Sequence, residues 1–460
     1  MQRLAGQDAY FLYRETPAAL MHTLKIAVCD APDPPLSREQ LAKNLERHLH
    51  LLPPLRRRVV LVPLGFHHPV WIEDPDFDLG FHLRRVGAPA PGGARELDEV
   101  VSEIASHPLD RERPLWELWL VEGLAGGRCA FVLKLHHAAA DGVATAALIS
   151  HSAARDALAD PPPPAAPWRP EPLPTARRLL ADACRDHLRQ LARLPGLVAR
   201  TARGVRAVRH RAREADVALP AMWSSPRLRF SRALRPRRIY ASTSLPLDAV
   251  RRAKDAHGAT LNDVVLALCA GAVRRTLVAA GELPAGPLSA SIPVAADASG
   301  APVRLAGNRV AYLMTALRTD LADPAERLRA TRAVTLEAKL QLELLGREAM
   351  AEWMDYLPPL PYTWMRRLQA RLRLADAHRP ASNLVVSNVP GPREPLYWSG
   401  SPLRELYSVG PLSEGIGLNL TVWSYCDRLY VGALACHEQL PELPELVDSL
   451  HAELAALLNA

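Results

Sequence analysis

The chain has 460 residues, of which 48% are hydrophobic and 23% are charged, and its formal net charge is +7. The length favours two domains or two similar halves, and the composition is typical of a globular protein and excludes extensive disorder. The six cysteines lack metal-ligand spacing, no signal peptide is recognisable, and no apolar stretch is long enough to span a membrane, so we expect a cytoplasmic protein with reduced thiols.

Residues 1–160 are predicted to form an N-terminal half in which strands alternate with helices. Two segments rich in apolar strand-forming residues, Leu24–Asp30 and Arg128–Leu135, are typical of strands. Apolar residues at helical spacing predict a helix over residues 37–55, with Ser37 as its N-cap, and another over residues 143–158.

Residues 161–225 are predicted to connect two halves. Repeated prolines between Pro161 and Pro174 favour extended backbone. Residues 175–215 then predict two helices that we expect to separate at Pro195, and they contain eleven Arg against three acidic residues. Because the rest of the chain is close to neutral, the basic pI describes this segment and does not indicate nucleic-acid binding.

Residues 226–460 are predicted to form a C-terminal half of similar character. A strand begins near Arg238, and after a first helix a second one begins near Thr260. Strand-like stretches follow at residues 311–317, 382–391, 417–425 and 428–437, and residues 441–458 predict a final helix. The whole pattern indicates a mixed α/β fold.

The segment FVLKLHHAAADG, from Phe131 to Gly142, carries the most chemical information. Side chains alternate along a strand, so His136 and His137 are expected to point to opposite faces. Asp141 follows at the start of the next helix, where its carboxylate can accept backbone N–H groups or an arginine and fix the turn that presents the imidazole.

A neutral imidazole at this place can remove a proton from a hydroxyl group that attacks a thioester. The spacing alone leaves three interpretations open, namely a catalytic histidine, a buried structural histidine and a metal site. The metal site is disfavoured because a metal needs three well-aimed ligands, whereas the two rings are predicted to face apart.

The motif HHAAADG resembles the HHxxxDG signature of the bacterial wax ester synthase/acyl-CoA:diacylglycerol acyltransferase family. Chloramphenicol acetyltransferase, carnitine acyltransferases and peptide-synthetase condensation domains share this signature. Further segments that resemble the family are PLW (residues 114–116), NDVVLA (262–267), GNRV (307–310) and SNVPGP (387–392). They follow in family order, so the resemblance covers nearly the whole chain.

The resemblance implies two chloramphenicol-acetyltransferase-like domains, each a mixed sheet flanked by helices, with the active-site tunnel between them. It implies that His137 is the general base, that Asp141 is structural and that Asn262 positions or polarises the reactants. An alternative role for Asn262 is to shape the helix start at Thr260. The expected supporting residues are His136, Gly142, Asp263 and Trp116, the last two through structure more than chemistry.

One segment departs from the family pattern. The family often has an arginine in a PVS-type run before GNRV, whereas this chain has PVAAD at residues 293–297. If that arginine pairs with an active-site acid, Arg309 is the candidate substitute, and the departure bears on the acceptor more than on the reaction type. A second histidine pair, His67-His68, is not followed by DG and is predicted to be non-catalytic.

The expected function is transfer of a long-chain acyl group from acyl-CoA to diacylglycerol or a long-chain alcohol, with acyl-CoA as co-substrate and no cofactor or metal. The alternatives are a condensation-type enzyme that uses a carrier-protein thioester, a catalytically silent lipid-binding homologue and a metal-dependent hydrolase. The basic segment 175–215 is interpreted either as an arm packed across both halves or as a peripheral contact with an anionic membrane or lipid droplet.

Overall fold

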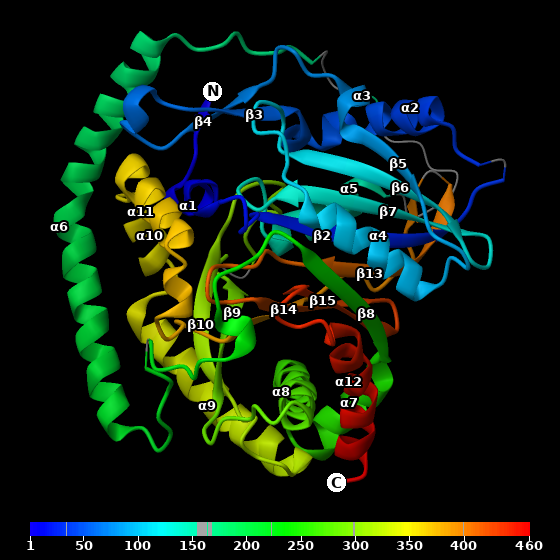
Figure 1. The fold of residues 1–460 in the computed structure, drawn as a ribbon. Coiled ribbons are helices and arrows are strands. Elements are labelled where there is room, and N and C mark those ends of the chain that lie inside the picture. The colour runs from blue at the N-terminus through cyan, green and yellow to red at the C-terminus, as the bar shows by residue number, and fades with distance from the viewer. Residues whose placement is uncertain (34, 154–162, 164–167, 222, 298–299, 399) are drawn as a thin grey trace.

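The computed structural model describes the whole chain except residues 34, 154–162, 164–167, 222, 298–299 and 399. Two six-stranded sheets, each covered by helices, lie one above the other in Figure 1. This arrangement confirms the predicted mixed α/β fold with two domains. Residues 161, 162 and 164–167 of the predicted 161–174 segment, and residues 154–158 of the predicted helix over 143–158, lie outside the described residues.

The upper sheet in Figure 1 has the strand order β12-β13-β2-β7-β6-β5, and only its β5–β6 pair is parallel. Helix α2 begins as predicted, because Ser37 and Gln40 form a reciprocal capping box. The strands are β2 (His22–Asp30), β5 (Leu83–Gly87), β6 (Trp116–Leu124), β7 (Arg128–His136), β12 (Tyr397–Trp398) and β13 (Ser401–Val409), and the helices are α2 (Arg38–His48), α3 (Leu79–His82), α4 (Ala94–Ser106) and α5 (Gly142–Ser152).

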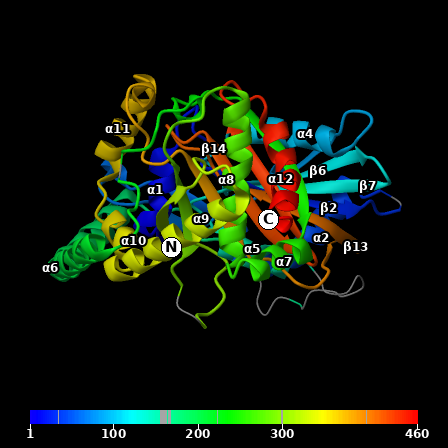
Figure 2. The same cartoon turned by 90° about the horizontal axis from the view of Figure 1, so that it is seen from below.

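The lower sheet has the order β10-β9-β11-β14-β15-β8, and β11 runs parallel to both of its neighbours. Helices α8 and α12 cover its outer face, as the view from below shows (Figure 2). Its strands are β8 (Arg238–Pro246), β9 (Leu288–Ala295), β10 (Val310–Leu317), β11 (Leu384–Val389), β14 (Leu418–Tyr425) and β15 (Arg428–Cys436), and its helices are α7 (Leu247–Ala256), α8 (Leu261–Ala279), α9 (Pro324–Leu345) and α12 (Leu443–Leu458).

The two sequence halves exchange structure, because β12 and β13 come from the C-terminal part of the chain and complete the N-terminal sheet. Val409 of β13 pairs with Leu24 of β2. The two sheets also approach closely, since a Cβ atom at Gly432 would lie 2.5 Å from the carbonyl oxygen of Ser408. The residue boundaries of the halves stay a prediction, but their sheets are interlocked rather than independent.

Helix α6 (Ala176–Glu214) is one continuous helix, so the prediction of two helices separated at Pro195 was wrong. A proline inside a helix removes one hydrogen bond and costs about 3 kcal/mol, and contacts on both sides of Pro195 offset that cost. Asp186 pairs with Arg3, near the N-terminus, at 3.1 Å, and Arg211 pairs with Glu337 of α9 at 2.6 Å. The helix therefore spans both halves, as Figure 1 shows on the left.

The remaining elements lie largely between α6 and the two sheets. They are β1 (Gln2–Arg3), β3 (Arg57–Val60), β4 (Val70–Glu73), α1 (Gly6–Arg14), α10 (Ala349–Met354), α11 (Pro359–Arg371) and the 3-10 turns η1 (Leu49–Leu51), η2 (Pro53–Arg56), η3 (Pro63–Gly65), η4 (Arg229–Ser231) and η5 (Leu374–Asp376). Within the described residues no single helix is long and apolar enough to cross a membrane, although the bent pair α7 and α8 together meets the length and composition criteria.

Candidate active site

His137 lies directly after strand β7, in the turn that leads to α5. Its backbone N–H donates to the carbonyl oxygen of Met21 at 2.8 Å, which extends the strand pairing to the histidine itself. Its ring stacks on the ring of Phe11 in α1, with centroids 4.2 Å apart. The imidazole lines a cavity of about 1450 Å³ whose walls come from both halves of the molecule.

A hydrogen-bond network orients the imidazole of His137. The Nδ2 group of Asn308 donates to the carbonyl oxygen of His137 and to the carboxylate of Asp8, each at 2.8 Å. The amide oxygen of Asn308 must then be the atom that lies 3.0 Å from Nδ1 of His137, and it accepts a hydrogen bond from that nitrogen. The proton therefore sits on Nδ1, and Nε2 carries the lone pair that a base needs.

The electrostatic surroundings keep His137 neutral. Burial lowers its pKa to about 4, and the protonated form of nearby Lys25, whose own pKa burial lowers to about 7, shifts the pKa of His137 in the same direction. Lys25 lines the same cavity and donates hydrogen bonds to Oγ1 of Thr23 at 2.9 Å and to Oγ of Ser408 at 2.6 Å. At neutral pH the imidazole of His137 is thus unprotonated and able to accept a proton.

His136 occupies different surroundings, as the strand alternation predicts. Its ring is fully buried, and its Nδ1 accepts the backbone N–H of Ala138 at 3.0 Å. Its Nε2 lies 3.5 Å from a carboxylate oxygen of Glu15. These contacts are structural, and His136 does not line the cavity that contains His137.

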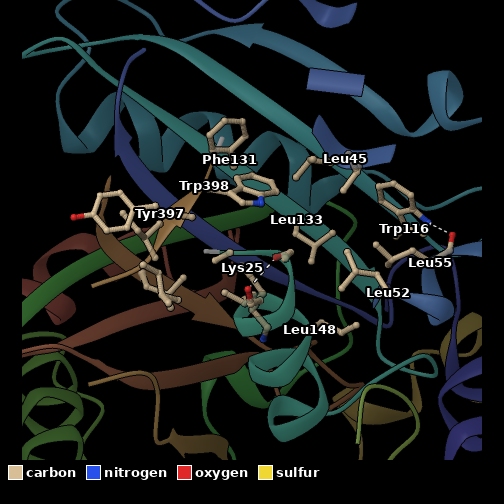
Figure 3. A pocket seen from close by; sticks show the side chains of 18 residues that line it. Lys25, Leu45, Leu52, Leu55, Trp116, Phe131, Leu133, Leu148, Tyr397 and Trp398 are labelled. Atoms are coloured by element: carbon tan, nitrogen blue, oxygen red, sulfur yellow. Dashed lines mark hydrogen bonds between the residues drawn. The ribbon is translucent and has the colours of Figure 1, made fainter. Parts of the chain in front are cut away.

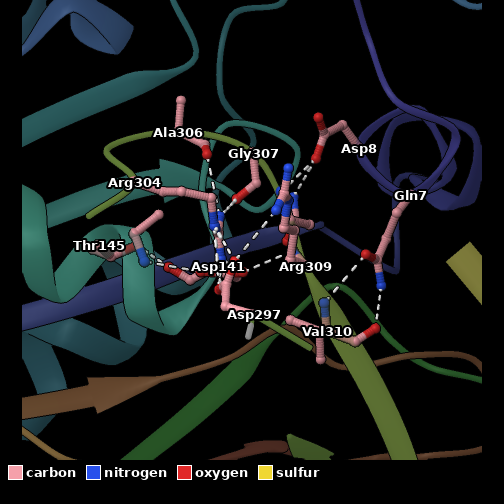
Figure 4. A network of polar contacts seen from close by, with 12 residues as sticks. Gln7, Asp8, Asp141, Thr145, Asp297, Arg304, Ala306, Gly307, Arg309 and Val310 are labelled. Atoms are coloured by element: carbon pink, nitrogen blue, oxygen red, sulfur yellow. Dashed lines mark hydrogen bonds and ion pairs between the residues drawn. The ribbon is translucent and has the colours of Figure 1, made fainter. Parts of the chain in front are cut away.

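Asp141 is the N-cap of α5 and holds the turn in place. One carboxylate oxygen accepts the backbone N–H of Ala144 at 2.9 Å, and the other accepts Nη2 of Arg304 at 2.8 Å. Figure 4 shows this network around Asp141. The following residue, Gly142, leaves room for the C-terminal half, since a Cβ atom there would lie 3.1 Å from Cγ2 of Val389. The predicted environment of Asp141 is therefore present.

The arginine that pairs with this acid is Arg304, and the proposal that Arg309 takes that place was wrong. Arg304 bridges the carboxylates of Asp141 and Asp297, at 2.8 and 2.7 Å. Arg309 offers only its backbone N–H to Asp141, at 2.9 Å, while its side chain is exposed. The reason is geometric: the residue before the start of β10 points its amide toward the turn and its side chain away from it.

Asn262 lines the same cavity as His137, so the fold brings these two predicted residues to one site. The start of α8 is capped by the neighbours of Asn262, because Thr260 and Asp263 form a capping box there. Asp263 is buried and also accepts a hydrogen bond from Thr335 at 2.8 Å. Asp263 is therefore structural, whereas Asn262 lines the cavity.

Trp116 pairs with Leu135 of β7 but does not line the cavity that contains His137. Its indole N–H donates to the carbonyl oxygen of Leu55 at 2.7 Å, and its ring stacks on His82 with centroids 4.4 Å apart. It lines a separate, almost wholly apolar pocket of about 60 Å³ beside the upper sheet, whose walls include Tyr397 and Trp398 (Figure 3). Lys25 lines both this pocket and the cavity of His137, so it stands between the two spaces.

Four residues of this site were not singled out from the sequence as functional candidates: Asp8, Phe11, Lys25 and Arg304. Phe11 and Lys25 lie in apolar segments with no motif. Burial raises the pKa of Asp8 to about 7. Asn308 was quoted only within GNRV, and its position in a motif was the one available signal. In the described part of the chain, no group of His, Cys, Asp and Glu side chains is arranged to hold a metal ion.

The fold and site together define a two-domain acyltransferase of the HHxxxDG type. A solved structure of the wax ester synthase/diacylglycerol acyltransferase from Marinobacter aquaeolei VT8 is similar, with a TM-score of 0.69, 28% identity and coverage of 99% of this chain and 98% of that chain. The first condensation domain of the CDA synthetase has the same fold, with a TM-score of 0.57, 20% identity and coverage of 99% and 96%.

The chain belongs to the wax ester synthase/diacylglycerol acyltransferase family. Residues 4–265 match the wax ester synthase/diacylglycerol acyltransferase catalytic domain, and residues 306–458 match the WS/DGAT C-terminal domain. A Mycobacterium tuberculosis protein provisionally named a diacylglycerol O-acyltransferase is 41% identical over 462 residues, covering 100% of this chain and 96% of the relative. Another from that organism, named in the same way, is 39% identical over 471 residues, covering 100% and 98%. The family assignment from the sequence is thus confirmed.

Proposed function

We propose that this protein transfers a long-chain acyl group from acyl-CoA to the hydroxyl group of diacylglycerol or a long-chain alcohol, with His137 as the general base. The observation that carries the proposal is an oriented, neutral imidazole whose Nδ1 is held by Asn308 and whose ring lines a cavity of about 1450 Å³. Ligand sites of roughly 300–1,000 Å³ are usual for one small molecule, so this cavity suits two substrates. The names of the relatives support the same activity.

The reaction needs one base and no covalent enzyme intermediate. Nε2 of His137 takes the proton of the acceptor hydroxyl while its oxygen attacks the thioester carbonyl carbon. The tetrahedral intermediate then loses the CoA thiolate, which recovers the proton from His137, so the products are an ester and CoA. Asn262 faces the same cavity and positions or polarises the reactants. In this scheme acyl-CoA is a co-substrate and no further cofactor takes part.

The experiment that tests this function supplies the purified protein with labelled palmitoyl-CoA and two competing acceptors, dioleoylglycerol and hexadecanol. Thin-layer chromatography should then show labelled triacylglycerol, wax ester or both. Palmitoyl-carrier protein serves as the comparison donor and should give little product. Absence of ester from palmitoyl-CoA, or a clear preference for the carrier-protein donor, would reject the proposal.

We further propose that the protein contacts an anionic lipid surface peripherally, through the outer face of α6 and the adjoining turn η3. Leu188 and Leu191 of α6 are 69% and 63% exposed, and Leu64 of η3 is 85% exposed. These residues lie close together, because His187 donates to the carbonyl oxygen of Phe66 at 2.7 Å. Exposed apolar side chains among arginines suit a membrane interface, although α6 is also held by packing against both halves.

Co-sedimentation with phospholipid vesicles tests this contact. Binding to vesicles that contain phosphatidylglycerol should exceed binding to pure phosphatidylcholine vesicles, and the double variant Leu188→Asp, Leu191→Asp should weaken it about tenfold. Val278→Asp is the matched control, because Val278 is also exposed but lies on α8. Equal binding by the double variant and the wild type would contradict the proposal.

A further inference from the structure

Two arginines line the cavity that contains His137. Arg14 ends helix α1, and Arg366 lies in helix α11, which packs against α1. Nη1 of Arg14 donates to the hydroxyl oxygen of Tyr10 at 3.0 Å, and Nη1 of Arg366 donates to the amide oxygen of Gln369 at 2.9 Å. Both arginines are half-buried, and each is held by a neutral partner on its own helix.

These two guanidinium groups lack an acidic partner. Among the described residues, no carboxylate lies within ion-pair distance of either group, and the Nε atom of each is buried without a hydrogen-bond partner. Arg304 in the same region shows the usual arrangement, since it bridges two carboxylates. Unpaired cations away from water are costly unless a ligand completes them.

The other charged groups of the cavity compensate the pair only in part. Glu414 lines the cavity and its charge acts on Arg366, but the described residues show no ion pair between them. The charge of Glu414 also acts on Arg238 and Arg373, and its carboxylate accepts the backbone N–H of Leu234 at 3.1 Å. Asp141 is occupied by Arg304, as described above. The remaining charged side chains on the cavity wall are basic, namely Lys25, Lys339, Arg347 and Arg379, of which Arg347 pairs with Glu343. The wall of the cavity is therefore mostly basic, and Arg14 and Arg366 each keep an Nε–H donor without a partner.

We propose that Arg14 and Arg366 form an anion subsite of the active-site cavity, which binds a phosphate or carboxylate group carried by a substrate. Planar guanidinium groups bind such oxyanions with two parallel hydrogen bonds. The inference rests on the proposed acyl transfer. In that reaction diacylglycerol and long-chain alcohols carry no charge, so a phosphate of CoA is the anion that the substrates supply. If the acceptor itself carries a carboxylate or phosphate group, that group is the other source of the anion.

The subsite is near the reacting atoms. The guanidinium carbon of Arg14 lies 4.9 Å from the ring centroid of Tyr10, that ring lies 5.9 Å from the ring of Phe11, and Phe11 lies 4.2 Å from His137. Arg14 is thus no farther from the imidazole than these three distances combined. Tyr362 of α11 packs on Tyr10 with centroids 5.8 Å apart, which brings the helix of Arg366 to the same place.

Kinetics with matched substrates tests the proposal. The variants Arg14→Gln and Arg366→Gln are compared with Arg367→Gln, a control on the same helix that is exposed and lies outside the cavity. For palmitoyl-CoA, each of the first two substitutions should raise KM about tenfold or more, whereas KM for palmitoyl-pantetheine, which lacks the phosphates, should change less than twofold. The control should change neither.

A second arm distinguishes the source of the anion. If the acceptor supplies it, the two variants should lose activity with ω-hydroxypalmitate but not with hexadecanol, at unchanged KM for palmitoyl-CoA. Either selective loss supports the subsite. Equal effects on charged and neutral substrates, or no effect, would overturn it, and thermal melting confirms that each variant is folded.

Binding of inorganic pyrophosphate, measured by calorimetry, gives a readout that does not need turnover. The wild type and Arg367→Gln should bind it with similar affinity, and the double variant Arg14→Gln, Arg366→Gln should bind it at least tenfold more weakly. Binding that depends on the two arginines in a protein that forms no ester would refute the proposed function but leave the subsite intact. Ester formation with pyrophosphate binding unchanged by the substitutions would refute the subsite alone.

Discussion

The molecule contains two pairs of adjacent histidines, and their surroundings differ. His137 has its Nδ1 bonded to Asn308 and its ring on the wall of the large cavity between the two halves. His67 has its Nδ1 occupied by the backbone N–H of His68 at 2.7 Å, and its Nε2 is buried without a partner. It lines a different cavity, of about 420 Å³, beside α6.

The comparison shows that a shifted pKa does not identify the catalytic histidine. Burial lowers the pKa of His67 to about 4, the same value as for His137. The difference lies in what holds each ring. His137 is followed by a turn that Asp141 and Arg304 fix. His67 is followed by His68, whose Nδ1 forms a hydrogen bond with the hydroxyl group of Tyr13 at 2.8 Å.

The substitution with the largest expected effect is His137→Ala. Loss of the base should lower kcat on the order of a thousandfold, because general-base catalysis contributes roughly 10²- to 10⁴-fold. His67→Ala is the matched control and should retain more than half of the wild-type kcat. Circular dichroism should show an intact fold for both variants. If His137→Ala kept more than a tenth of wild-type turnover, its role as the base would be rejected.

The next largest effect is expected for Arg304→Gln, which should lower the stability of the protein. Asp141 would keep a buried charge without its partner, which costs about 3 kcal/mol of unfolding free energy, measured by urea denaturation. Arg309→Gln is the control, because its side chain is exposed and lies 3.8 Å from Asp297, and it should change stability by less than about 0.5 kcal/mol. Equal destabilisation by the two substitutions would show that Arg304 does not hold the turn.

The stability of this turn illustrates what the sequence could and could not predict. The histidine motif, the helix cap at Asp141 and the strand before them are local in sequence, and periodicity with capping rules predicted them. Arg304 lies 163 residues from Asp141, and no local rule connects such distant positions. An arginine was one of the partners that the sequence allowed for Asp141, and Arg309 was the candidate. Identifying Arg304 required the direction of each side chain.

The same limit applies to the larger architecture. Segments such as Leu24–Asp30 were predicted as strands because their side chains are apolar and β-forming. The pairing of β13 with β2 joins residues far apart in the chain, and strand propensity carries no information about the partner. The continuity of α6 through Pro195 was missed for a related reason, since tertiary contacts on both sides of the proline outweigh its local cost.

Asn308→Ala tests whether the orientation of the ring separates His137 from His67. Without the amide oxygen, Nδ1 of His137 loses its acceptor and the imidazole is free to rotate or change tautomer. We expect kcat to fall about 10- to 100-fold with little change in KM. Asn262→Ala shares the same cavity and is expected to affect the substrates directly, so its KM should also rise. Wild-type kcat in Asn308→Ala would mean that packing on Phe11 alone orients the ring.

The smallest effect concerns pH and Lys25, whose charge is one cause of the low pKa of His137. Because the base form of His137 is the neutral one, protonation of His137 should lower kcat/KM of the wild type only as pH approaches its pKa of about 4. Asp8 and Lys25, whose pKa values burial brings to about 7, change charge well above that acid limb. Lys25→Met removes a positive charge that disfavours imidazolium, so the pKa of His137 should rise and kcat/KM should begin to fall at a higher pH.

The low pKa of His137 also affects stability. As pH falls from the usual pKa of 6.5 toward 4, the unfolded chain binds a proton that folded His137 does not, so unfolding becomes easier. His67 should contribute to that acid destabilisation in the same direction. Lys25→Met should leave this contribution unchanged, because the pKa of His67 is set by burial and by His68, Arg3, His187 and Asp186. If the acid limb of the kcat/KM profile stays at the same pH in Lys25→Met, the charge of Lys25 does not contribute and burial alone sets the pKa of His137.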